Sequence, residues 1–221
     1  MTKADFISLV LRILNEADAS IDGTTLVGAD MTNISTYVEK LYPVAYRRSV
    51  KLFPRNWYAA KTVSTPTVTA NVPDGTGYYI LPGDYLELIS FKMQGWKTAC
   101  MTAPEETPQL NKKQSNEYLR GTVQRPVCIL RMIPVTTIVA PITTTIKKVL
   151  YYYSLPRTSD AATHVVEQFI YIPNVDTLGS TVDVSDAGIM ALAYLTASTV
   201  LISVEKTVQA QAIEAKIPEL I

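Results

Sequence analysis

A histidine, two pairs of carboxylates and two cysteines are the residues of this chain whose types could do chemistry. His164 is the only histidine among 221 residues. A histidine-based catalytic triad would have to use it, and no Gly-x-Ser-x-Gly turn supplies a nucleophile. Histidine-led metal sites need two or more His or Cys ligands at short spacing, and the sequence offers none. We therefore interpret His164 as a loop residue and expect no metal site.

The carboxylate pairs are Asp84 with Glu87 and Glu105 with Glu106. Either pair could share acid–base work, but no partner base is apparent, so we interpret them as surface or turn-forming acids. The stretch 75–80 begins like a dinucleotide-binding fingerprint. It ends in isoleucine and leads into a predicted strand, whereas a phosphate cradle needs a helix N-terminus after the glycines. We expect a turn there, no catalytic residue and no cofactor, and we expect that the protein is not an enzyme.

The two cysteines, Cys100 and Cys128, are too few for a disulfide framework, and both lie among apolar residues. Buried free thiols in a reducing compartment are therefore expected.

Nucleic-acid binding has one sequence feature in its favour and one against it. Tyr151, Tyr152 and Tyr153 could stack bases. Aromatic triplets in a strand more often pack on both faces of a sheet, however, and few basic residues lie nearby. Lys plus Arg and Asp plus Glu both number 20, whereas a protein that grips phosphates carries a basic excess. A nucleic-acid-binding or packaging accessory protein is kept as the alternative function.

The spacing of apolar residues predicts an α+β fold in a single domain, 1–221. Residues 1–57 and 184–217 form its helical part, a bundle of two N-terminal helices and one long C-terminal helix. Thr2 can cap the first helix, and Pro43 predicts a kink or a restart in the second. Residues 61–155 are β-rich and predict a small antiparallel sheet with an inserted helix near 107–119. Residues 156–183 are expected to form an irregular connector.

The last predicted helix is apolar on nearly all sides, and 187–204 contains no charge. This length just reaches the lower limit for a membrane span. The segment is rich in Ala, Ser and Thr and lacks flanking basic clusters, so we expect burial in protein and no membrane partner. Either it is an ordinary core helix, or its small residues also admit a second subunit. The apolar tail after it can fray or dock on a partner. The predicted interface residues are Ala187, Ala191, Ser198, Ile213, Ile217, Leu220 and Ile221.

Two longer motifs then follow one another in order. Residues 53–61 read FPRNWYAAK, and residues 78–89 read YYILPGDYLELI. Together they resemble the head-to-tail adaptor proteins of short-tailed phages, which include the gatekeeper or tail tubular protein A group and the head-completion adaptors. Shorter matches at 120–122, 149–153 and 191–195 keep the same order. The resemblance covers about three-quarters of the chain. The ring proteins of crAss-like phages are one candidate group.

The resemblance implies a structural subunit of a head–tail connector ring, typically of twelve copies. Such a ring docks to the portal protein, extends the DNA channel and provides the attachment platform for the next tail or ring protein. Genomic DNA would pass through its lumen without specific readout. The expected location is the neck of the virion, after assembly in the host cytoplasm. We predict that the framework of this fold is held by Trp57, Leu81, Pro82, Asp84, Leu86, Leu88 and Gly121.

Overall fold

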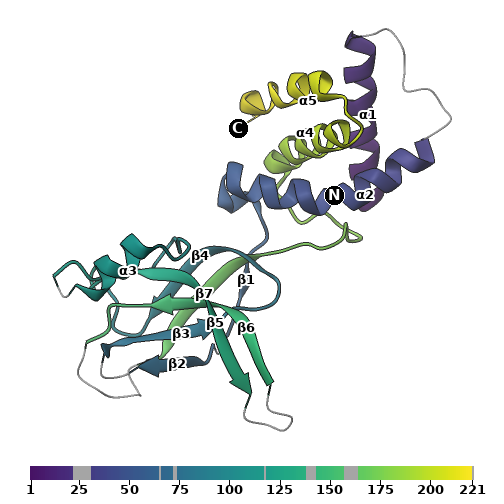
Figure 1. Ribbon diagram of the computed structural model, residues 1–221. Helices are drawn as coiled ribbons and strands as arrows, with labels where there is room; N and C mark the ends of the chain where they lie inside the picture. Colours follow the sequence, from purple (N-terminus) through teal and green to yellow (C-terminus); the bar gives the residue numbers. More distant parts are fainter. Residues whose placement is uncertain are drawn as a thin grey trace. The chain divides into compact units, whose positions relative to one another are not determined.

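The computed structural model describes residues 1–21, 31–64, 66–71, 74–116, 118–137, 143–156 and 164–220. The fold is α+β, as the sequence predicts. In place of the predicted single domain, the chain forms two compact units. The helical unit consists of Met1–Ala59 and Pro173–Ile221, and the β unit is the continuous segment Ala60–Ile172 (Figure 1). The β unit is therefore an insertion between the two halves of the helical unit.

The helical unit is built from α1 (Lys3–Ile21), α2 (Met31–Leu52), α4 (Asp186–Ser203) and α5 (Thr207–Glu214), with short 3-10 turns at Arg55–Trp57 and Ile217–Leu220. The Thr2 hydroxyl accepts a hydrogen bond from Asp5 N at 3.2 Å and so caps α1. α2 continues through Pro43. The central helix is α4, which contacts α1, α2 and α5 and buries Leu192 and Leu195 completely.

The final helix is divided, whereas the sequence predicts one helix to Ile217. α4 ends at Ser203, and α5 begins at Thr207. Glu205 lies between them with φ of 63°, a left-handed conformation that ends an α-helix. Lys206 N then donates to Leu201 O at 2.9 Å, which closes the turn. No glycine or proline marks this turn, so the sequence carries no local signal for it.

An ion pair joins three helices of this unit. Arg48 of α2 donates twice to the Glu214 carboxylate of α5, at 2.6 and 3.1 Å. Ser198 of α4 donates to the same carboxylate at 2.7 Å. The hydrogen bonds from Arg48 lower the pKa of Glu214 and keep it ionised. The Glu214 carboxylate therefore links α2, α4 and α5.

The β unit contains two antiparallel sheets instead of the one small sheet predicted. The first has the order β1 (Lys61–Thr62), β7 (Val166–Pro173), β4 (Tyr85–Met93). The second has the order β2 (Val68–Asn71), β3 (Thr76–Ile80), β6 (Thr143–Tyr152), β5 (Cys128–Thr137). The inserted helix, α3, spans Pro108–Ser115 and is shorter than the predicted 107–119. Thr107 caps it through Leu110 N at 3.2 Å.

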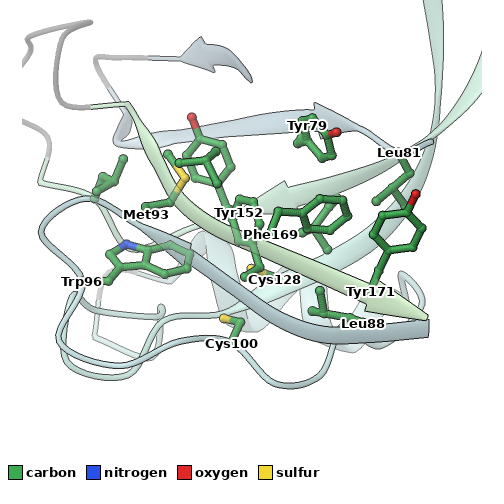
Figure 2. Close-up of a cluster of buried hydrophobic side chains, with 14 residues drawn as sticks. Tyr79, Leu81, Leu88, Met93, Trp96, Cys100, Cys128, Tyr152, Phe169 and Tyr171 are labelled. Carbon is green, nitrogen blue, oxygen red and sulfur yellow. The ribbon is translucent and has the colours of Figure 1, made fainter. Parts of the chain in front are cut away.

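The core of the β unit lies between its two sheets (Figure 2). The rings of Tyr79 and Phe169 lie 4.9 Å apart, and those of Phe91 and Tyr152 lie 6.2 Å apart, so each pair joins one sheet to the other. Aromatic contacts of this kind add to the stabilisation that burial of apolar area provides. The cluster contains Tyr79, Leu81, Leu88, Phe91, Met93, Trp96, Cys100, Cys128, Leu150, Tyr152, Leu155, Val166, Phe169 and Tyr171.

Strand β7 corrects the prediction of an irregular connector over 156–183. It occupies Val166–Pro173, pairs with β1 through Lys61 and Tyr171, and buries Phe169 completely. Its exposed and buried residues do not alternate regularly, which hides the strand from a two-residue pattern search. β7 is held in place by its pairing with β1, about 110 residues earlier in the chain. Local sequence cannot reveal such a pairing.

Candidate interaction site

Four of the seven predicted interface residues lie inside the helical unit. Ala191 and Ser198 are 0% exposed, Ile213 is 2% exposed and Ile217 is 7% exposed. Their small or apolar side chains pack α4, α5 and the last 3-10 turn within one molecule, so a partner protein cannot reach them. The interface prediction is wrong for these four residues, because burial in the chain's own core produces the same sequence pattern as burial between subunits.

The other three predicted interface residues have different positions. Ala187 is exposed and Leu220 is half-buried, while Ile221 lies outside the described residues. Within the described ranges, α4 (Asp186–Ser203) is also the one helix long and apolar enough to cross a membrane, and 61% of it is buried in the chain's own fold. That burial is typical of a core helix.

The residues that could do chemistry are engaged in structural contacts. His164 Nδ1 lies 2.7 Å from the Tyr152 hydroxyl, and burial lowers the pKa of the imidazole. Its place in a loop agrees with the sequence, but its burial was not predicted. The Asp84 carboxylate accepts from Lys61 Nζ at 2.5 Å and from the Tyr171 hydroxyl at 2.9 Å. The Lys61 hydrogen bond is the main cause of the lowered pKa of Asp84. Asp84 thus joins the β3–β4 turn to β1 and β7.

Both cysteines are free and buried, as expected. Burial raises the pKa of the Cys128 thiol, and the neighbouring Cys100 raises it further. A buried protonated thiol is a poor nucleophile. Across the described parts of the chain, no group of three or more His, Cys, Asp or Glu side chains is placed to hold a metal ion.

The tyrosine triplet does not form a base-stacking platform. Tyr152 is fully buried in the core and Tyr153 is 7% exposed. Tyr151 is half-buried, with its hydroxyl 3.1 Å from Thr76 Oγ1 and its ring 4.4 Å from the Arg131 guanidinium carbon. Alternate packing on the two faces of β6 explains why three aromatic residues occur in a row.

The predicted framework residues lie in both units. In the helical unit, Trp57 O accepts from Ser185 N at 2.7 Å, and its ring lies so close to Gly188 that a Cβ there would be 2.9 Å from it. In the β unit, Gly121 N donates to Gln114 Oε1 at 3.0 Å, and a Cβ at Gly121 would lie 2.3 Å from Ser154 Oγ. Leu81 and Leu88 are in the β core, and Pro82 and Leu86 are half-buried.

A two-stranded ribbon extends from the second sheet of the β unit. β5 and β6 pair over their full described length, from Cys128–Tyr152 to Thr137–Thr143. β3 pairs only with 149–152 of β6. Residues 132–137 and 143–148 therefore extend past the sheet, and β5 and β6 reach beyond β2 and β3 in Figure 1. We call this part the β5–β6 ribbon. A two-stranded ribbon is marginally stable by itself, which makes contact with another surface favourable.

The open edge of β5 is poorly suited to pairing with another strand. Leu130 N donates to Pro104 O at 2.8 Å, and Leu130 O accepts from Glu106 N at 3.0 Å. Since successive residues of a strand direct their backbone groups to opposite sides, Pro134 also faces this outer edge. Proline has no N–H, so the edge lacks a donor there. Contact through the faces of the ribbon is therefore more favourable than extension of the sheet.

One face of the ribbon carries exposed apolar side chains. Directly paired residues share a face, so Met132, Pro134 and Ile146 lie together with Lys148. Met132 is 62% exposed and Ile146 is 70% exposed. The same face continues inward to Leu150, which is fully buried in the core. The face of β5 and β6 that forms the core at Leu150 therefore continues along the ribbon, where it is exposed to solvent. We call Met132, Pro134 and Ile146 the ribbon patch.

A second feature of the β unit is a hollow beside α3, which we call the α3 pocket. Its volume is about 480 Å³. Its lining is polar, with two aromatic side chains and three basic ones. The lining residues are Asp74, Thr76, Asn111, Lys112, Gln114, Ser115, Arg120, Arg131, Tyr151 and Tyr153. The sequence predicts no shared site for the basic residues of this pocket, because they come from three separate segments of the chain.

No protein-family model matches the chain, and no curated protein matches it either.

Proposed function

We propose that this protein is a non-enzymatic structural subunit of a phage head–tail connector ring. In this proposal it docks to the portal, extends the DNA channel and carries the next tail or ring protein, in the neck of the virion after assembly in the host cytoplasm. The ordered motifs from Phe53 to Leu195 support the family, and the equal numbers of acidic and basic residues suit a conduit that does not hold DNA. No membrane partner is part of the proposal.

The observation that carries the proposal is the exposed ribbon patch. Met132 is 62% exposed and Ile146 is 70% exposed, so these apolar side chains contribute little to the core of the β unit. Closed rings use heterologous interfaces, in which a patch on one subunit fits a different surface on its neighbour. We assign the ribbon patch to that neighbour contact, in the ring or in the adjoining one. Burial of such apolar residues is the main favourable term in protein association.

The test compares two glutamate substitutions on adjacent residues. Ile146→Glu places a charge in the ribbon patch, while Thr145→Glu places the same charge on the opposite face of the same strand. Both side chains are exposed, so neither change should unfold the chain. Wild-type protein and the two variants are mixed with the portal protein encoded in the same genome, and assemblies are measured by mass photometry.

We expect a large defined complex from wild-type protein and from Thr145→Glu, and separate species from Ile146→Glu. Persistently separate species with wild-type protein would contradict the connector function. Equal assembly of all three proteins would remove the ribbon patch from the interface. Gel shifts with DNA that weaken steeply with salt, together with no assembly, would favour the alternative of a nucleic-acid-binding accessory protein.

A further inference from the structure

We propose that the α3 pocket binds a small organic anion through a phosphate or carboxylate group. This binding site goes beyond the proposed structural role and does not depend on it. Three observations carry it: guanidinium groups already held in place, a buried N–H without an acceptor, and an excess of positive charge around a hollow.

Arg131 is held in a fixed position. Its guanidinium carbon lies 4.4 Å from the centre of the Tyr151 ring and 5.9 Å from that of Tyr153. One terminal nitrogen donates to Asn111 Oδ1 at 2.6 Å, and the side chain is 20% exposed. Arg120 is also held, because a terminal nitrogen donates to the backbone carbonyl of Asp74. Arginines fixed in advance bind oxyanions at a low entropic cost.

The Nε–H of Arg131 has no hydrogen-bond acceptor within the described residues. Glu106 Oε1 lies 3.1 Å from Nε, close enough for an ion pair but not aligned for a hydrogen bond. The same carboxylate oxygen already accepts from Asn111 Nδ2 at 2.5 Å. The Nε–H is thus paired with Glu106 by charge but lacks a well-aligned hydrogen bond, so part of the donor capacity of this guanidinium is unused.

The charges around the pocket do not balance. Lys112, Arg120 and Arg131 line it with Asp74, and Glu106 pairs with Arg131 at its edge. Three cations against two carboxylates leave an excess of one positive charge, in a chain whose formal net charge is zero. The Asp74 carboxylate also accepts from Asn71 at 2.8 Å, and Arg120 donates to a neutral backbone carbonyl. An anion would restore neutrality.

The size and lining of the pocket narrow the class of ligand. A volume of about 480 Å³ holds a molecule larger than a bare ion. It lies within the range of small-molecule sites, about 300–1,000 Å³. Gln114, Ser115 and Thr76 supply further polar groups, and the two tyrosines supply apolar surface. A phosphate or carboxylate at the arginines, with a small organic body along the tyrosines, fits this distribution.

The test titrates the full chain with inorganic phosphate, adenosine monophosphate and succinate by isothermal titration calorimetry at low salt. Lys112→Gln and Arg120→Gln remove one pocket cation each. Lys112→Gln is the more decisive variant, since Lys112 is exposed and its side chain forms no hydrogen bond or ion pair with another described residue. Lys147→Gln, on the exposed β6 segment, is the matched control because it removes the same charge outside the pocket.

We expect saturable binding of at least one probe, weakened about tenfold by each pocket variant and unchanged by Lys147→Gln, since each removes a charge-assisted hydrogen bond. Preference among the three probes identifies phosphate or carboxylate as the group bound and shows whether the organic body contributes. The proposal is overturned if no probe binds up to about 10 mM, which corresponds to a negligible affinity. It is equally overturned if Lys147→Gln weakens binding as much as Lys112→Gln does, because the attraction would then be general.

Discussion

At the scale of single residues, the groups that suggest chemistry in the sequence serve packing in the structure. His164 illustrates this, because its imidazole is 6% exposed and meets the hydroxyl of a fully buried tyrosine, Tyr152. A histidine in that position has no access to a substrate. Burial lowers the pKa of this imidazole, however, so it has a consequence for stability.

We predict that the β unit loses stability below pH 6.5 because of His164. Burial lowers the pKa of His164 in the folded chain, while the unfolded chain keeps an ordinary value near 6.5. As the pH falls below 6.5, the unfolded state takes up a proton that the folded state does not. The contribution of His164 to the free energy of unfolding is therefore complete above the pKa of the unfolded state. It decreases as the pH falls from that pKa to the pKa of the folded state, by at most about 1.4 kcal/mol per pH unit.

Urea unfolding of wild-type protein and of His164→Gln between pH 7.5 and about 5.5 measures this effect, in a range above that in which carboxylates titrate. The chain has one histidine, so no other side chain of that type obscures the result. Glutamine retains a polar group for the Tyr152 hydroxyl. We expect the slope of unfolding free energy against pH to flatten in the variant. An unchanged slope would show that His164 does not cause the pH dependence of the unfolding free energy.

The sequence predicts residue roles where they depend on local spacing, and not where they depend on distant strands. The predicted cap Thr2 lies next to the helix it begins and accepts a backbone hydrogen bond there, as Thr107 and Ser185 do for α3 and α4. The burial of His164 depends on the strands around it, and the α3 pocket depends on Arg120 and Arg131 from different segments. Such contacts leave no periodic pattern in a single sequence.

At the scale of elements, helices were more predictable than strands, because helical periodicity is local. α1 and α2 follow the apolar spacing of the sequence, whereas β7 lies in a stretch that the sequence predicts to be irregular. The turn from α4 to α5 was also missed, because Glu205 adopts a positive φ without any glycine. This turn directs Ile213 and Ile217 into the helical core. The apolar C-terminal segment is thus part of the fold instead of a free docking arm.

We predict that removing residues 213–221 destabilises the helical unit. The truncation deletes two isoleucines that are 2% and 7% exposed, together with Glu214, the shared partner of Arg48 and Ser198. Truncating one buried isoleucine to alanine costs about 2–5 kcal/mol, so the loss should be about 4 kcal/mol or more. Thermal unfolding followed by circular dichroism at 222 nm measures it, since the affected structure is helical.

The matched control removes only residues 218–221. It keeps Ile213, Glu214 and Ile217 and deletes mainly exposed side chains. We expect its melting temperature to stay close to that of the full chain. If both truncations melt like the full chain, the C-terminal segment does not contribute to the core, and its apolar residues would again be available for a partner.

At the scale of the whole molecule, the chain is one compact unit inserted into another. The helical unit needs α1 and α2 from before the insertion and α4 and α5 from after it. The β unit is continuous, and its first and last strands, β1 and β7, pair through Lys61 and Tyr171. The two ends of the insertion are therefore adjacent, as domain insertion requires. The sequence predicts the α+β class, but this arrangement follows from the pairing of β1 with β7, which it does not reveal.

We predict that residues 60–173 fold as an isolated fragment with a cooperative unfolding transition. The fragment retains both sheets and the whole cluster around Phe169, and Pro173 is kept because β7 ends there. The matched control is Phe169→Ala in the same fragment, which removes a fully buried ring and should cost about 3–5 kcal/mol. Near-ultraviolet circular dichroism during urea unfolding measures both, because the core is aromatic. A fragment without a cooperative transition would mean that the insertion depends on the helical unit for its stability. A cooperative fragment that Phe169→Ala leaves unchanged would place its core elsewhere.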